Sequence, residues 1–379
     1  MSRYIKNAMA VGVAMSLGLG LGATAARAAC ATLDAPPTAM VPATGEVLRA
    51  GHLGREIGDT QPLIHFYSDL IGLELVGART APRPFFVARG LQVFAELGED
   101  DDVYKSSSRV ALLPIPGTAA TAGGPEMTIE AIEIKGVKSV PYHPALRDPG
   151  ASYLKILVRD LDKTLAVLKS EWYTVITEGG DPVELASWPG ISGKVRAVML
   201  KDTDGYPVQL IQITPTPTST APADSKVLGA RVAIVVDNLE ASCKFYQDLA
   251  GPELKFWVSP LMGDKADAQL THTSGPFKMA QAMVPGSPVA LELIEYKDHN
   301  HAFKRGFIQD PGTAHFLFMV KDDDAIISRV HAINAHTLSK ANDATFISPT
   351  VRSFFVPDPQ GFWVEFMDHD VKRDPNAKQ

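Results

Sequence analysis

A strand-like segment followed directly by a helix-like segment occurs four times along the 379-residue chain, and this repetition limits the fold more than any other feature. In each copy an apolar run ends at Asp or Asn, and apolar residues spaced three and four apart follow it. The four polar residues are expected to be helix N-caps, because such side chains accept hydrogen bonds from the first free amides of a helix. They are Asp59, Asp160, Asn238 and Asp322.

Each copy continues into strand-like segments separated by turns. Copies two and four end in "KDTDGYPVQLIQI" and "VPDPQGFWVEFMDH", where a tight turn precedes an alternating final strand. Copies one and three end in the matching segments "MTIEAIEIKG" and "VALELIEYKD". The interval from Glu130 to Tyr153 equals the interval from Glu292 to His315, and both contain Asp-Pro-Gly. This equal spacing indicates that the chain arose by duplication of an ancestor that contained two of these copies.

The first residues, "MSRYIKNAMAVGVAMSLGLGLGATAARAAC", have basic residues before a short apolar core and an Ala-Arg-Ala tripeptide after it. This order is typical of a cleaved secretory signal, and a single membrane anchor is the alternative interpretation. The mature protein is therefore expected in the periplasm or outside the cell, with no membrane contact after cleavage. Cys30 and Cys243 are the two cysteines, and the sequence leaves open whether they form a disulfide or Cys243 stays buried and unpaired.

The composition points to a globular protein and away from a nucleic-acid partner. Hydrophobic residues make up 45% of the chain and charged residues 21%, which suits packed cores rather than disorder. The formal net charge is −7, and the chain has no long basic run that could bind a phosphate backbone. Nucleic acid is therefore excluded as an expected partner.

These segments resemble the vicinal oxygen chelate superfamily, which includes glyoxalase, bleomycin resistance proteins and extradiol dioxygenases. The resemblance rests on the helix cap seven residues after the first strand position, the Phe-Tyr pair in the helix, and the Asp-Pro-x-Gly turn before a terminal Glu. It covers residues 48–370. It implies an α+β fold in which four βαβββ modules pair into two open, curved, eight-stranded mixed-sheet domains with helices outside.

Two consecutive two-module domains are expected from this resemblance. A Pro- and Thr-rich linker lies between the two halves of the chain. The expected segments are a signal peptide at 1–28, a flexible leader at 29–47, a first glyoxalase-like domain at 48–213, the linker at 214–226, a second glyoxalase-like domain at 227–372 and a tail at 373–379. Because four modules complete both domains within one chain, a monomer is compatible with this arrangement.

The resemblance also implies that site residues come from the first and last strands of the two modules in a pair. The first pair would present His52, Glu130, Tyr153 and Gln209, and the second Arg231, Glu292, His315 and Glu365. The candidate metal ligands are His52, Glu130, Gln209, Glu292, His315 and Glu365, for Zn, Ni, Mn, Co or Fe. A metal-free protein is the alternative.

Arg231 stands where the first copy has His52, and its charge argues against a metal beside it. A guanidinium about 4 Å from a divalent ion is repelled by roughly 8 kcal/mol at an effective dielectric constant of about 20. The arginine is expected instead to pair with Glu292 or Glu365, or to hold a substrate carboxylate.

The resemblance implies a lyase or isomerase that polarises vicinal oxygens while a glutamate moves a proton. Candidate bases are Glu292, Glu365 and Glu130, with Arg231 as a polarising group and Tyr153 as a hydrogen-bond donor. A metal-free protein that sequesters a ligand, as bleomycin resistance proteins do, is the first alternative. An extradiol dioxygenase is the second, and its need for two histidines conflicts with Arg231 in the expected pair.

Overall fold

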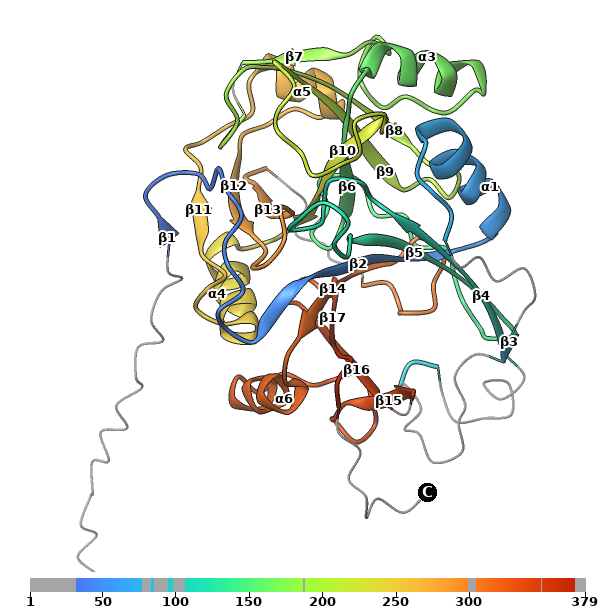
Figure 1. Ribbon diagram of the computed structural model, residues 1–379, viewed down its shortest axis with the longest axis vertical. Helices are drawn as coiled ribbons and strands as arrows, with labels where there is room; N and C mark the ends of the chain where they lie inside the picture. The colour runs from blue at the N-terminus through green and yellow to red at the C-terminus, as the bar shows by residue number, and fades with distance from the viewer. Residues whose placement is uncertain are drawn as a thin grey trace, which may run out of the picture.

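The computed structural model describes residues 32–76, 83–84, 95–97, 106–186, 188–298, 305–348 and 350–371. Its strands form two sheets, labelled sheet A and sheet B here (Figure 1). Sheet A contains β1 (Thr32–Leu33), β6 (Ser152–Val158), β7 (Val183–Leu185), β8 (Lys194–Lys201), β9 (Pro207–Thr214), β10 (Val227–Val235), β11 (Phe256–Val258), β12 (Phe277–Met283) and β13 (Ala290–Tyr296). Sheet B contains β2 (Val47–Ile57), β3 (Arg83–Pro84), β4 (Ser107–Pro114), β5 (Thr128–Lys135), β14 (Ala314–Val320), β15 (Thr345–Ser348), β16 (Val351–Pro357) and β17 (Trp363–Asp368).

Helices follow the first strand of every module. They are α1 (Thr60–Ile64), which continues into the π-helix η1 (His65–Ile71), then α3 (Leu161–Ser170), α4 (Leu239–Ala250) and α6 (Asp323–Ala332), with α5 (Lys265–Thr271) as an addition in the third module. All four expected N-caps are confirmed, because each cap side chain accepts from a backbone amide two or three residues later. Among the described residues, no helix is both long and apolar enough to cross a membrane.

The four βαβββ modules are confirmed, but they pair in a different order from the one expected. Sheet A has the strand order β1-β11-β12-β13-β10-β6-β9-β8-β7, which joins the second and third modules. Sheet B has the order β15-β16-β17-β14-β2-β5-β4-β3, which joins the first and fourth. The first strands meet antiparallel in both sheets, β6 with β10 and β2 with β14. The expected pairing of the first module with the second and of the third with the fourth is therefore wrong.

The connections explain this nested order. The segment between β5 and β6 and the segment between β13 and β14 each carry the chain from one sheet to the other, and these are the two segments with Asp-Pro-Gly. They contact each other, since the Tyr142 amide donates to the Pro311 carbonyl at 2.8 Å and the Val140 amide donates to Asp310 Oδ1 at 2.8 Å. The Pro- and Thr-rich linker joins β9 to β10 inside sheet A, so it does not separate two sheets.

The leader is not wholly flexible. Its residues Thr32 and Leu33 form β1, which pairs parallel with β11 and gives sheet A a ninth strand. Cys243, buried in α4, is disulfide-bonded, which answers the question that the sequence left open. The other cysteine in the sequence is Cys30. It lies outside the described residues, as do the expected signal peptide at 1–28 and the tail at 373–379.

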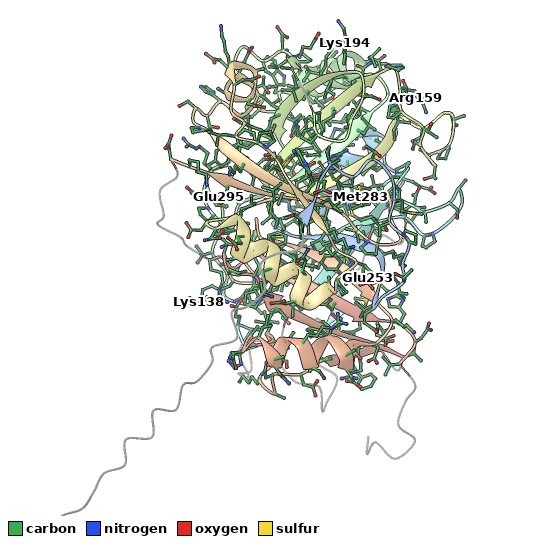
Figure 2. All side chains as sticks on the ribbon, turned by 90° about the vertical axis from the view of Figure 1, so that its left-hand side faces the viewer. Lys138, Arg159, Lys194, Glu253, Met283 and Glu295 are labelled. Carbon is green, nitrogen blue, oxygen red and sulfur yellow. The ribbon has the colours of Figure 1, made fainter. Side chains whose placement is uncertain are left out.

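A single large core packs the two sheets and their helices together. Residues that directly follow the first-strand site positions belong to it and are fully buried, as the repeat predicts: Leu53, Leu154, Val232 and Phe316. Because strand side chains alternate, the site positions themselves face the opposite side of each sheet. In Figure 2, Lys194 of β8 lies at one end of the molecule and α6 at the other.

The Phe-Tyr pair of the helices links consecutive modules across the core. Tyr67 of η1 donates to Asp202 at 3.1 Å, and Tyr246 of α4 donates to Asp358 at 3.2 Å. Both acids begin the tight turns before the final strands β9 and β17. The first module therefore contacts the second, and the third contacts the fourth, through a tyrosine and an aspartate, whereas the strands pair the second module with the third and the first with the fourth.

Candidate functional site

Four of the expected metal ligands meet on sheet B, and we call them the histidine site: His52, Glu130, His315 and Glu365. His52 Nε2 lies 2.8 Å from Glu365 Oε2, 3.2 Å from Glu130 Oε2 and 3.1 Å from His315 Nε2. His315 Nε2 lies 3.3 Å from Glu365 Oε2. Two histidines and two carboxylates thus converge from the first and last strands of two modules.

Strand register explains why these side chains share one face. Gly54 of β2 lies between Glu130 of β5 on one side and His315 of β14 on the other. A Cβ atom at Gly54 would lie 1.9 Å from His315 Cε1, so a glycine leaves the room that the imidazole ring occupies. Since residues two apart on a strand face the same way, His52 joins them on this side. Gly54 was not among the residues singled out from the sequence.

Glu365 is the most firmly held acid of the histidine site. Its side chain is 5% exposed, and Ser353 Oγ donates to its second oxygen. Burial alone would raise the pKa of Glu365, but the charge of His52 and the hydrogen bonds from both histidines hold the pKa well below its usual range. Burial opposes protonation of His52, and the charges of Glu130 and Glu365 nevertheless raise its pKa. Glu130 is less enclosed, with a side chain that is 23% exposed.

The spacing of these donor atoms suits a divalent metal ion. Nitrogen and oxygen ligands bind first-row ions at about 2.1 Å, so neighbouring donors on one ion lie about 3.0 to 3.4 Å apart. The four separations given above, 2.8 to 3.3 Å, lie in or slightly below that range. Two imidazole nitrogens 3.1 Å apart and both buried also need a proton or a cation between them. The residues of the histidine site therefore fit a metal ion.

The other expected site residues meet on sheet A and do not reach the histidine site. There Arg231 Nη1 donates to Glu292 Oε1 at 3.0 Å, so the expected pairing of Arg231 with Glu292 is confirmed and pairing with Glu365 is wrong. Tyr153 and Gln209 lie on the same sheet and therefore neither joins His52. The two expected quartets were wrong because they followed the expected pairing of consecutive modules.

Lys155 occupies the centre of this second site, and the sequence analysis missed it. Its Nζ donates to Glu292 Oε2 at 2.5 Å and lies 4.4 Å from the ring centre of Trp188. We call Lys155, Arg231 and Glu292 the lysine site. Both oxygens of Glu292 are taken by cations, and two positive side chains repel any metal ion. A lone lysine in the apolar strand "SYLKILV" was the signal that could have revealed it.

Five aromatic residues of the two sheets divide between the core and the two sites. Phe256 and Phe318 belong to the shared core. Phe277 and Trp257 pack in the cluster beside the lysine site. Trp363 is the one that faces the histidine site, because it lies opposite His315 in the register of β14 and β17.

Comparisons with known proteins agree with this architecture. Residues 230–366 match the model of the Glyoxalase/Bleomycin resistance protein/Dioxygenase superfamily. A mutant glyoxalase I from Zea mays is 18% identical, with 85% of this chain and 94% of that chain covered and a TM-score of 0.53. A second mutant of the same enzyme is 19% identical, covers 85% and 92% of the two chains and has a TM-score of 0.51. No curated protein matches the sequence.

Proposed function

Because residues 230–366 belong to the glyoxalase/bleomycin resistance protein/dioxygenase superfamily and the chain shares the fold of glyoxalase I, we propose a metal-dependent lyase or isomerase. Its substrate would be a small molecule with two adjacent oxygen atoms. The observation that carries this proposal is the convergence of His52, Glu130, His315 and Glu365 at donor separations of 2.8 to 3.3 Å.

The four residues of the histidine site would hold a first-row divalent ion such as Zn, Ni, Co, Mn or Fe. Such an ion supplies Lewis acidity, which makes a hydrogen on the carbon beside a carbonyl easier to remove. Four protein donors leave two positions on a six-coordinate ion, enough for two vicinal oxygens. The mixture of imidazole and carboxylate donors is compatible with several metals, so the identity of the ion is a question for metal analysis.

Glu130 is the residue that we assign to proton transfer. A base must reach the substrate, and the Glu130 side chain is 23% exposed whereas that of Glu365 is 5% exposed. Glu365 is bound by both histidines and by Ser353, and its lowered pKa makes it a weak proton acceptor. We therefore assign Glu365 to holding the site together and Glu130 to moving the proton.

The test follows exchange of the hydrogen beside a carbonyl in D2O by proton NMR, with hydroxyacetone and other small α-hydroxyketones as probes. We expect the metal-loaded protein to accelerate exchange and Glu130→Gln to lose about 100-fold or more, since general bases contribute about 10²–10⁴. Glu130→Gln should retain its metal, because His52, His315 and Glu365 remain as ligands. Exchange that is unchanged in Glu130→Gln would reject the assignment.

An extradiol dioxygenase is the second candidate, because the structure supplies the two histidines that the expected pairing lacked. His52 and His315 with Glu365 make a set of two histidines and one carboxylate. That chemistry needs open positions for both oxygens of a catecholate and for O2, and Glu130 as a fourth ligand would leave too few. Oxygen uptake with Fe(II) and catechol distinguishes the candidates, since the first predicts none.

Export from the cytoplasm is also part of the proposal. It is supported by the signal-like first residues and by the disulfide bond of Cys243, because disulfides persist in oxidising compartments. Cell fractionation with mass spectrometry of the mature N-terminus tests it. Recovery of the uncleaved chain in the cytoplasm with free thiols would contradict it.

A further inference from the structure

The lysine site carries more positive charge than the side chains around it neutralise. Lys155 and Arg231 share one carboxylate, that of Glu292, at 2.5 and 3.0 Å. Asp267 interacts electrostatically with Lys155 but forms no ion pair with it among the described contacts, and its Oδ2 accepts from the backbone amides of Gly263 and Asp264. Among the side chains in direct contact, two cations therefore share one anion, which leaves one positive charge without a contacting counter-ion.

Arg231 has hydrogen-bond donors to spare. A guanidinium group has five N–H donors, and among the described residues its one side-chain partner is Glu292. The side chain is 20% exposed, whereas Glu292 is fully buried. Arg231 and Lys155 both line an open cleft between the leader, the linker, β9 and β10. Free guanidinium donors therefore face solvent-accessible space.

A second buried polar group lies beside this cleft without a partner. Gln281 of β12 is fully buried and lies opposite Glu292 in the strand register, so it shares the face of the lysine site. Both its Oε1 and its Nε2 lack a hydrogen-bond partner among the described residues. An unsatisfied buried amide costs about 1 to 3 kcal/mol, which favours a bound polar group here. Gly190, which lines the cleft, lies next to it, since a Cβ there would be 3.6 Å from Gln281 Nε2.

The walls of the cleft are mostly apolar. They are formed by side chains of the leader, β6, β9 and β12: Met40, Leu157, Ile211, Ile213 and Met283. Met283 is labelled in Figure 2. A ligand that fits must therefore combine one anionic end with an apolar body.

We propose that this cleft is a metal-independent binding site for small monocarboxylates with an apolar body. The carboxylate would bind the free N–H groups of Arg231 and balance the charge that Glu292 leaves uncompensated. The amide of Gln281 lies within the same site, and the apolar body packs against the aliphatic walls. Lys155 and Arg231 take both oxygens of Glu292, so binding needs no metal. The proposal does not depend on the activity of the histidine site.

The test uses the full-length mature protein, stripped of metal with EDTA, and titration calorimetry with octanoate and octanamide. The two probes have equal chain length and differ in charge at one end. We expect octanoate to bind at least tenfold more tightly than octanamide. Arg231→Gln should weaken octanoate at least tenfold and leave octanamide unchanged, and Arg231→Lys should fall between Arg231→Gln and the unaltered protein.

Two controls separate the site from general charge effects. Arg196→Gln removes an exposed arginine of β8 in the same sheet, and His315→Ala disables the histidine site; neither should change octanoate affinity. Thermal unfolding followed by circular dichroism checks that each variant is folded. Equal binding of octanoate and octanamide, unchanged octanoate affinity in folded Arg231→Gln, or no octanoate binding to the unaltered protein would each overturn the proposal.

Discussion

His52 Nε2 lies 2.8 Å from Glu365 Oε2, although 313 positions separate the two residues in the sequence. This contact brings residues from near the two ends of the chain together in the histidine site. It joins the first strand of one module to the last strand of another. Because Glu365 also contacts His315, at 3.3 Å, its carboxylate is the one donor that touches both imidazoles. Loss of its charge should therefore weaken metal binding more than loss of any other single charge.

Metal content tests this directly. We expect the unaltered protein to retain one divalent ion per chain after dialysis, and Glu365→Gln to bind it about 100-fold more weakly, since even residues that only support metal ligands contribute about 10- to 100-fold. Glu184→Gln, an exposed glutamate of β7, is the matched control and should retain the ion. Two ions per chain would show that the lysine site also binds metal, contrary to the arrangement of Lys155 and Arg231 around Glu292.

The four modules, and the side of each first strand that faces the core, could be predicted from the sequence. Hydrophobic periodicity, helix caps and turns are local properties of the chain. The same pattern placed Asp59, Asp160, Asn238 and Asp322 at helix starts, as the structure confirms. Alternation along each first strand likewise separated core residues from site residues. Local patterns therefore determined each module, and the family resemblance placed all four members of the histidine site among its eight candidate positions.

The choice of partner module is not local. An edge strand of one module offers the same backbone hydrogen bonds to any similar module, so register and alternation do not select its partner. The two crossover segments between β5 and β6 and between β13 and β14 contact each other, and a contact between segments so distant in the sequence leaves no local pattern. Side-chain chemistry held a further signal: His52 and His315 suit one metal site, whereas Arg231 and Lys155 suit none. Lys155 was missed because a single charged residue in an apolar strand indicates a buried charge but does not show which residue pairs with it.

Gly54→Ala should disable the histidine site. The added methyl group would lie 1.9 Å from His315 Cε1, so the ring must leave its position. We expect metal affinity to fall by at least about tenfold while the fold is kept, because strand backbone accepts alanine. Gly58→Ala is the control, since its Cβ would approach Asp204 Oδ1 at 3.3 Å and no site residue. Equal metal content in Gly54→Ala and the unaltered protein would contradict the role of Gly54.

Asp358 should make stability depend on pH. Burial raises the pKa of Asp358 to about 7, although the backbone amides of Gln360 and Phe362 and the Tyr246 hydroxyl lower it in part. In the unfolded chain an aspartate titrates near about 3.9. The folded state therefore holds this proton more tightly, so its stabilising contribution is complete below about pH 4 and is lost as pH rises through about 7.

Asp358→Asn isolates this effect, because asparagine cannot titrate and its oxygen still accepts from the amides of Gln360 and Phe362. Between pH 4 and pH 7, the free energy of unfolding of the unaltered protein should fall relative to the variant by up to about 1.4 kcal/mol per pH unit. Urea unfolding at several pH values measures the difference. Parallel curves for the two proteins would show that Asp358 does not titrate in this range.

The matching acid in the second module, Asp202, should affect stability through a buried ion pair. Arg55 Nη1 lies 2.8 Å from Asp202 Oδ2, both side chains are 0% exposed, and the guanidinium carbon lies 3.5 Å from the ring centre of Tyr206. Asp202→Asn would leave the buried guanidinium without a counter-charge, which costs about 3 to 5 kcal/mol. Arg55→Met together with Asp202→Asn should recover part of that loss, because no unpaired charge then remains.

Urea unfolding of the single and double variants measures these free energies. Arg196→Gln is the matched control, since Arg196 also pairs with an aspartate, Asp162, but at the surface, where such a pair contributes about 0 to 1 kcal/mol. A loss below about 1 kcal/mol in Asp202→Asn would mean that water reaches the Arg55 guanidinium. The junction between the first two modules would then depend on Tyr67 and the apolar core rather than on charge.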